Sequence, residues 1–185
     1  WGNKVWVLAQ QSEYYTRHLL LHEGAHSLAY HLFDGAGPTW FQEGSAELLA
    51  THHGKDLDIA VNRIPLSRDH APFWGRFKRM NQAREQSLVP TFETVLGYQP
   101  NLTGDVATYS WSWAACMMLS VYPEYRPAFL AAAQNGQETG PLFNRQLQTA
   151  LGNQWPILAA RWRLTCNDID YGFDWNREQV SLSAK

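Results

Sequence analysis

The chain has 185 residues, a formal net charge of −2, and a composition that is 45% hydrophobic and 14% aromatic. This length can bury a sizeable core, and this apolar content is not that of a disordered chain. The near balance of 15 Lys and Arg against 17 Asp and Glu gives no electrostatic reason to expect nucleic acid or an anionic membrane as a partner. No stretch is apolar over a length that predicts a membrane span. We therefore expect residues 1–185 to form a single domain, which could be part of a longer protein.

The first predicted element is a strand over Val5–Ala9, an apolar run of the kind that favours β structure. Asp58–Pro65 is a second possible strand. The expected sheet is therefore small and lies near the N-terminus.

A long helix is predicted next, and it carries His22-Glu23-Gly24-Ala25-His26. Apolar residues recur at helical spacing through this segment, and residues 34–38 have the composition of a helix stop. Because residues four apart lie on one helix face, His22 and His26 can bind a single Zn²⁺. Glu23 lies beside them and could take a proton from a metal-bound water. Gly24 costs about 1 kcal/mol relative to Ala in a helix interior. Because Gly has no side chain, another backbone or a substrate could approach closely there.

A second helix is predicted over residues 38–50, where Trp40, Phe41 and two Leu supply apolar surface. The short connection predicts that the two helices pack antiparallel. A catalytic zinc site needs a third protein ligand, and either Glu43 or Glu47 could face the two His. The spacing alone does not choose between them.

The pattern His-Glu-x-x-His followed by Glu-Gly-x-Ala-Glu resembles the gluzincin zinc metallopeptidases, including the aminopeptidase N group and bacterial gluzincin-like domains. The resemblance covers about residues 14–52. It implies a zincin-like helical domain with an active-site helix, one Zn²⁺ per chain, and Glu43 as the third ligand. It also implies that Glu47 accepts the other ring N–H of a ligand His and fixes its tautomer; the alternative is an ordinary solvated Glu.

Two further features bear on the kind of peptidase. Some gluzincins stabilise the oxyanion with a Tyr from a later helix, and Tyr109 is the candidate here, with a core role as the alternative. The Gly-x-Met-Glu-Asn segment of aminopeptidase N relatives is absent, since all three Met lie downstream of the zinc motif. A typical aminopeptidase is therefore not expected. The longer metzincin pattern is also absent.

The remainder of the chain is predicted to be helical, which makes the fold class mostly α (α+β). His18, one turn before His22, is expected at the surface, with a local hydrogen-bond partner as the alternative. The basic cluster Arg76–Arg79 is expected to be solvated, and Asn101–Thr103 is a formal glycosylation sequon. His31, His52, His53 and His70 carry no spacing argument, although the pair His52-His53 could favour the negative end of the second helix. The predicted helices cover 73–86, 91–96, 107–121, 127–134, 142–151 and 155–166, and residues 167–175 are expected to be irregular.

Two Cys do not make a disulfide framework. Cys116 lies in an apolar run and is expected to be a small buried side chain, while a single bridge to Cys166 stays open. No segment decides the compartment, and a secreted or cell-envelope location is slightly favoured over a cytoplasmic one.

The leading hypothesis is a zinc metallopeptidase that acts on a peptide or protein substrate, with His22, His26 and Glu43 on the metal and Glu23 as general base. Two alternatives stay open: a binding or scaffold domain that keeps the helix pair without turnover, and a hydrolase of a non-peptide amide. Retention of Glu23 favours the enzyme over the scaffold. The oligomeric state is not predicted.

Overall fold

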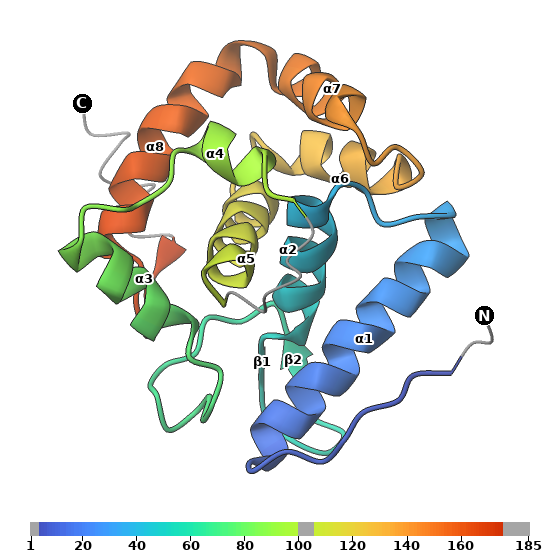
Figure 1. The fold of residues 1–185 in the computed structure, drawn as a ribbon, viewed down its shortest axis with the longest axis vertical. Helices are drawn as coiled ribbons and strands as arrows, with labels where there is room; N and C mark the ends of the chain where they lie inside the picture. The colour runs from blue at the N-terminus through green and yellow to red at the C-terminus, as the bar shows by residue number, and fades with distance from the viewer. Residues whose placement is uncertain (1–3, 100–105, 176–185) are drawn as a thin grey trace.

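A computed structural model describes residues 4–99 and 106–175, and these residues are mostly helical (Figure 1). The one sheet among them is an antiparallel pair, β1 (His52–His53) with β2 (Ala60–Val61), in which His52 lies opposite Val61. The predicted class, mostly α with a small sheet, is confirmed. The helices are α1 (Glu13–Phe33), α2 (Thr39–Ala50), α3 (Arg76–Glu85), α4 (Phe92–Leu96), α5 (Val106–Val121), α6 (Arg126–Gln134), α7 (Pro141–Leu151) and α8 (Trp155–Asp168), with a 3-10 turn η1 (Gly152–Gln154) before α8.

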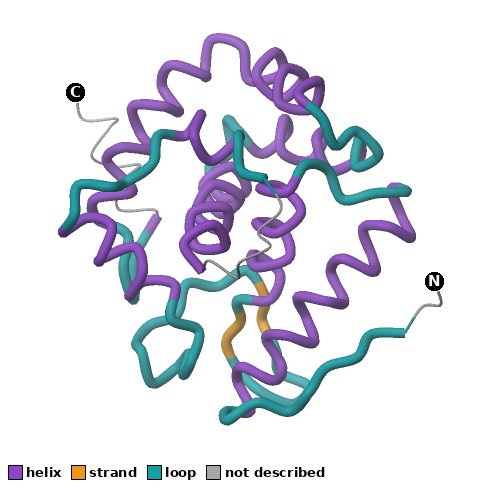
Figure 2. Tube along the Cα trace, in the orientation of Figure 1, coloured by secondary structure: helices purple, strands orange, loops and turns teal. Residues whose placement is uncertain are grey.

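The strand predicted at Val5–Ala9 is wrong. This segment is a loop (Figure 2), and Trp6 and Leu8 are 86% and 83% exposed. No described strand lies beside it to supply backbone partners, and an apolar run without such partners does not make a sheet. The sheet instead follows α2, and its second strand falls inside the predicted Asp58–Pro65 segment.

Helix α5 forms the centre of the core, and it is the most buried element of the fold. Figure 1 shows α2, α3, α4 and α6 arranged around it. Trp113 of α5 packs edge-to-face against Trp74 and Phe77, with ring centroids 5.1 and 5.6 Å apart. Aromatic pairs of this kind add to the apolar burial that stabilises the fold.

Gly44 brings α2 very close to α5. A Cβ at this position would lie 2.4 Å from the carbonyl oxygen of Ser112 and 2.7 Å from Sγ of Cys116. No other residue type fits this contact without movement of a helix backbone. Gly44 lies between Glu43 and Glu47 on α2. The close approach therefore also fixes the distance of these two residues from α5.

Helix α1 lies at the edge of the molecule and packs mainly against α2 (Figure 1). Its first turn is capped by Ser12, whose hydroxyl accepts a hydrogen bond from the backbone N–H of Tyr15 at 3.0 Å. It ends at Phe33, and the capping residue Asp34 takes the left-handed conformation (φ 54°). The connection to α2 is held by the N–H of Gly37, which donates to the carbonyl of Gly136 at 2.8 Å.

Both cysteines are buried, as expected for Cys116, and the bridge between them that the sequence left open does not form. Burial raises the pKa of the Cys116 thiol far above its usual range. Among the described helices, none combines the length and apolar character that crossing a bilayer demands. The sequon Asn101–Thr103 lies outside the described residues.

Candidate metal centre

The candidate site lies where α1 crosses α2, and it is built from polar side chains on facing turns. His18 and His22 both approach Glu47, and His22 and His26 both approach Glu43. Residues later in α1 therefore contact residues earlier in α2, so the two helices pack antiparallel, as predicted. The helical repeat places the three His on one face of α1 because they are spaced four residues apart.

Three atoms that could bind a metal ion converge where His22 and His26 face Glu43. Nε2 of His22 lies 3.2 Å from Oε2 of Glu43 and 3.1 Å from Nε2 of His26, and the distance from His26 Nε2 to Glu43 Oε2 is 3.6 Å. Ligands at 2.0–2.1 Å from a tetrahedral Zn²⁺ are roughly 3.3 Å apart. The triangle formed by His22, His26 and Glu43 therefore has the size that one zinc ion requires, and two imidazoles with one carboxylate are ligands suited to zinc.

The charges in this triangle are tightly coupled. Burial by itself would lower the pKa of His22, but its contacts with Glu43 and Glu47 outweigh burial and raise that pKa to about 9. Burial would raise the pKa of Glu43, yet contacts with His22 and His26 lower it to about 2. In the metal-free protein a proton on His22 thus balances carboxylate charge, which is the task a cation would perform.

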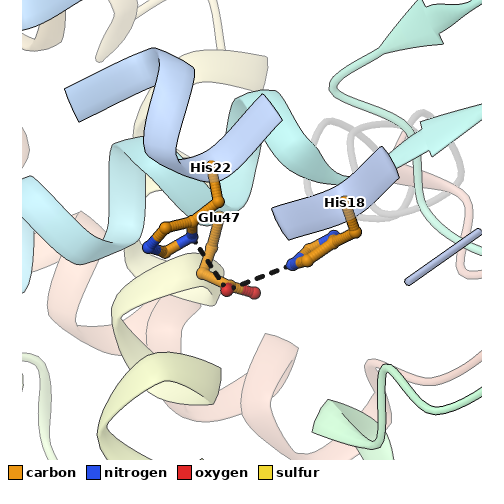
Figure 3. A group of neighbouring side chains, drawn as sticks. All are labelled: His18, His22 and Glu47. Atoms are coloured by element: carbon orange, nitrogen blue, oxygen red, sulfur yellow. Dashed lines mark hydrogen bonds and ion pairs between the residues drawn. The ribbon is translucent and has the colours of Figure 1, made fainter. Parts of the chain in front are cut away.

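Glu47 lies one turn further along α2 and is almost completely buried. Its Oε1 atom lies 3.1 Å from Nδ1 of His22 and 3.2 Å from Nε2 of His18, and Figure 3 shows the carboxylate between the two rings. Nδ1 of His22 makes no hydrogen bond, and its contact with Glu47 is an ion pair. Glu47 is therefore not a solvated helix residue, and it faces the ring nitrogen of His22 that the metal triangle does not use.

Arg76 closes this second group of side chains. Its Nε donates to Oε2 of Glu47 at 3.0 Å and its Nη2 donates to Oε1 at 2.8 Å, a bidentate pair from α3 to α2. Burial would raise the pKa of Glu47, but Arg76 and His18 hold it well below its usual range. His18, His22 and Glu47 are close enough to hold a metal ion. The guanidinium already occupies both Glu47 oxygens, however, and would repel a second cation, so this group is better suited to hydrogen bonding.

Two residues that the sequence analysis placed in solvent are buried at this site. His18 is fully buried: its Nδ1 lies 3.2 Å from the carbonyl of Ala50, at the end of α2. Both nitrogens of His18 face acceptors, and a neutral ring can donate to only one of them. Arg76 was predicted to lie on the wet face of its helix but is 6% exposed, whereas Lys78 and Arg79 are exposed as expected. The buried partner Glu47, distant in sequence, is the reason for both corrections.

The remaining predicted residues are Tyr109 and Glu23. The ring of Tyr109, on α5, lies 6.2 Å from that of His22, and the Arg76 guanidinium lies 5.6 Å from the Tyr109 centroid. Burial and the nearby carboxylates raise the pKa of Tyr109, so it carries its proton at neutral pH. Glu23 is exposed, next to His22 on α1. The space beside Gly24 is open, and no other backbone approaches it.

Of the other histidines, His31 and His70 are exposed and His53 is half-buried. His52 is buried, and its Nδ1 donates to the carbonyl of Ala50 at 2.8 Å, which fits the predicted preference for the end of the second helix.

Comparison of the chain with family models, with curated proteins and with solved structures found no match.

Proposed function

We propose that this protein is a zinc-dependent peptidase of the gluzincin type, with one Zn²⁺ held by His22, His26 and Glu43. The observation that carries the proposal is the triangle of His22 Nε2, His26 Nε2 and Glu43 Oε2, whose sides of 3.1, 3.2 and 3.6 Å fit a single tetrahedral ion. The resemblance of the two helices to gluzincins supports the same ligand set.

Bound zinc would polarise the carbonyl of the substrate and lower the pKa of a water molecule bound to the metal. The residues of the chain divide the rest of the work. Glu23, exposed beside the ligand His22, takes the proton from the attacking water as general base. Glu47 lies against Nδ1 of His22, the nitrogen that the metal would leave free, and its negative charge favours the tautomer with a proton there. Tyr109 keeps its phenolic proton beside the site and can donate it to a developing oxyanion.

The substrate class in this proposal is a peptide or protein. The absence of a Gly-x-Met-Glu-Asn segment argues against a typical aminopeptidase. An inactive scaffold and a hydrolase of another amide are outcomes that the experiment below distinguishes.

The test combines metal analysis with digestion of a broad peptide library. Wild-type protein should bind one equivalent of zinc and cleave peptides, and Glu23→Gln should keep the zinc but lose cleavage. His22→Ala should lose stoichiometric zinc. The matched controls are Glu13→Gln and His31→Ala, exposed residues of the same helix, and both should behave like wild type.

Tight binding of one zinc by His22→Ala would contradict the ligand assignment. Zinc binding without cleavage of peptides by the wild type would favour the scaffold. Cleavage of a non-peptide amide alone, still dependent on Glu23, would support the second alternative.

A further inference from the structure

The ion pair between Arg76 and Glu47 joins α3 to the candidate metal centre, and none of the functions assigned above uses it. Both partners are nearly inaccessible: Glu47 is 1% exposed and Arg76 is 6% exposed. The guanidinium also donates from Nη1 to the carbonyl of Trp74 at 3.2 Å, which fixes its plane. A buried pair of this kind seldom adds much stability over apolar side chains of the same volume, which favours a positional role.

The geometry shows what this pair positions. Arg76 Nη2 and His22 Nδ1 meet the same carboxylate oxygen, at 2.8 and 3.1 Å. Because Arg76 engages both oxygens of Glu47, the carboxylate cannot rotate about its last bond without breaking a charge-assisted hydrogen bond. The same guanidinium lies against the Tyr109 ring, 5.6 Å from its centroid. One side chain thus contacts both the partner of His22 and the candidate oxyanion donor.

We propose that Arg76 is a positioning residue: by gripping both oxygens of Glu47, it holds that carboxylate against Nδ1 of His22, so that Nε2 is presented toward His26 and Glu43. This proposal rests on the proposed function for its purpose. It acts through Glu47, and Arg76 itself touches neither metal nor substrate.

The test is a double-mutant cycle on zinc affinity, measured by competition with a chelator. Arg76→Met should weaken zinc binding by about 10–100-fold, the usual effect of losing an outer partner of a ligand. Arg76→Lys keeps the positive charge but loses the two-pronged contact, so it should recover only part of the loss. In a Glu47→Gln background, Arg76→Met should cause no further loss, because the residue through which Arg76 acts is already altered.

Arg161 provides a matched control. It is also a buried arginine paired with a carboxylate, Glu124, at 2.6 Å, and it lies over a tyrosine ring, that of Tyr122, at 4.1 Å. Arg161→Met should lower thermal stability without changing zinc affinity. A loss of zinc affinity equal to that of Arg76→Met would mean that loss of a buried arginine is enough, and would overturn the proposal.

A second readout requires no metal. The ¹⁵N shifts of the His22 ring in metal-free protein, at about pH 10 where the ring is neutral, report which nitrogen carries the proton. In the wild type the proton should be shared, because Nδ1 faces Glu47 and Nε2 faces Glu43. The Arg76 variants should shift the proton from Nδ1 toward Nε2. Arg76→Lys serves for this comparison if Arg76→Met does not fold. Unchanged shifts, or additive effects in the cycle, would overturn the positioning role and leave the proposed function standing. If wild-type protein binds no zinc, the proposed function fails and the ¹⁵N comparison still decides the positioning role.

Discussion

The two ring nitrogens of His22 face different partners. Nε2 faces Glu43 and His26, while Nδ1 faces Glu47. A neutral ring has one proton, and a metal ligand must offer its other nitrogen bare. In the proposed site the carboxylate on each side of the ring would therefore have a different function: Glu43 would bind the metal, and the charge of Glu47 would favour a proton on Nδ1.

This division predicts unequal effects of the two α2 carboxylates on zinc. In the proposed site, Glu43→Gln would remove one of three bonds from the protein to the ion, whereas Glu47→Gln would remove only an outer contact worth about 10–100-fold in affinity. We expect Glu43→Gln to weaken zinc binding much more than Glu47→Gln, measured by titration of both folded variants against the same chelator. An experimental structure with zinc on Glu47 and with Glu43 turned away would contradict this assignment.

The stability of the metal-free protein should depend on pH through His22 and Glu43. The pKa of His22 is raised from 6.5 to about 9, so its contribution is fully present below pH 6.5 and is lost as the pH rises toward 9. The pKa of Glu43 is lowered from 4.5 to about 2, so its contribution is present above pH 4.5 and is lost as the pH falls toward 2. Urea unfolding of metal-free wild type should therefore show falling stability between pH 6.5 and 9. His22→Gln should lack that slope; an equal slope in this variant would assign it to other groups.

At the scale of the elements, the decisive contact is that of α2 with α5. Gly44 permits it, because Ser112 and Cys116 leave no room for a side chain there. Gly24 on α1 is also inside a helix, but nothing lies within 4 Å of a Cβ built on it. The two glycines thus have opposite structural roles.

The same substitution should have opposite signs at these two positions. Gly44→Ala should lower the free energy of unfolding by about 1–3 kcal/mol, because the added methyl forces the helices apart. Gly24→Ala should raise it by up to about 1 kcal/mol, since Ala favours helix and meets no neighbour. Thermal unfolding of both metal-free variants measures the difference. A Gly44→Ala protein as stable as wild type would show that α2 and α5 can separate at little cost.

For the whole molecule, the candidate site joins an edge helix to the core. α1 packs mainly against α2, and α2 against the central α5 (Figure 1). A metal ion shared by α1 and α2 would therefore attach the peripheral helix to the most buried part of the fold.

Zinc should accordingly stabilise the protein, and α1 most of all. At a free zinc concentration of 100 times Kd the expected gain is about 2.7 kcal/mol. Hydrogen exchange with and without zinc should show the largest gain in protection in α1, a smaller gain in α2 and little change in α5. His22→Ala should show no gain from zinc. Equal gains in all helices of the wild type would mean that the metal acts on global unfolding alone.

The sequence by itself determined the helices and the two histidines of one α1 face, because helical periodicity and capping are local properties. It predicted the class, the boundaries of most helices to within three residues, and the antiparallel pairing of α1 and α2. It also led to a strand at Val5–Ala9 that does not form, because a strand needs a partner that its own residues do not specify.

Only the tertiary structure decided which carboxylate faces which nitrogen. Glu43 and Glu47 share a helix face and are equivalent by spacing, but the crossing of α1 over α2 brings Glu43 to Nε2 of His22 and Glu47 to Nδ1. The burial of His18 and Arg76 could not be predicted either, because a polar or charged residue is expected to be solvated unless its buried partner is known. Those partners lie 29 residues away along the chain. Only the packing of α1 against α2, and of α2 and α3 against α5, brings them together.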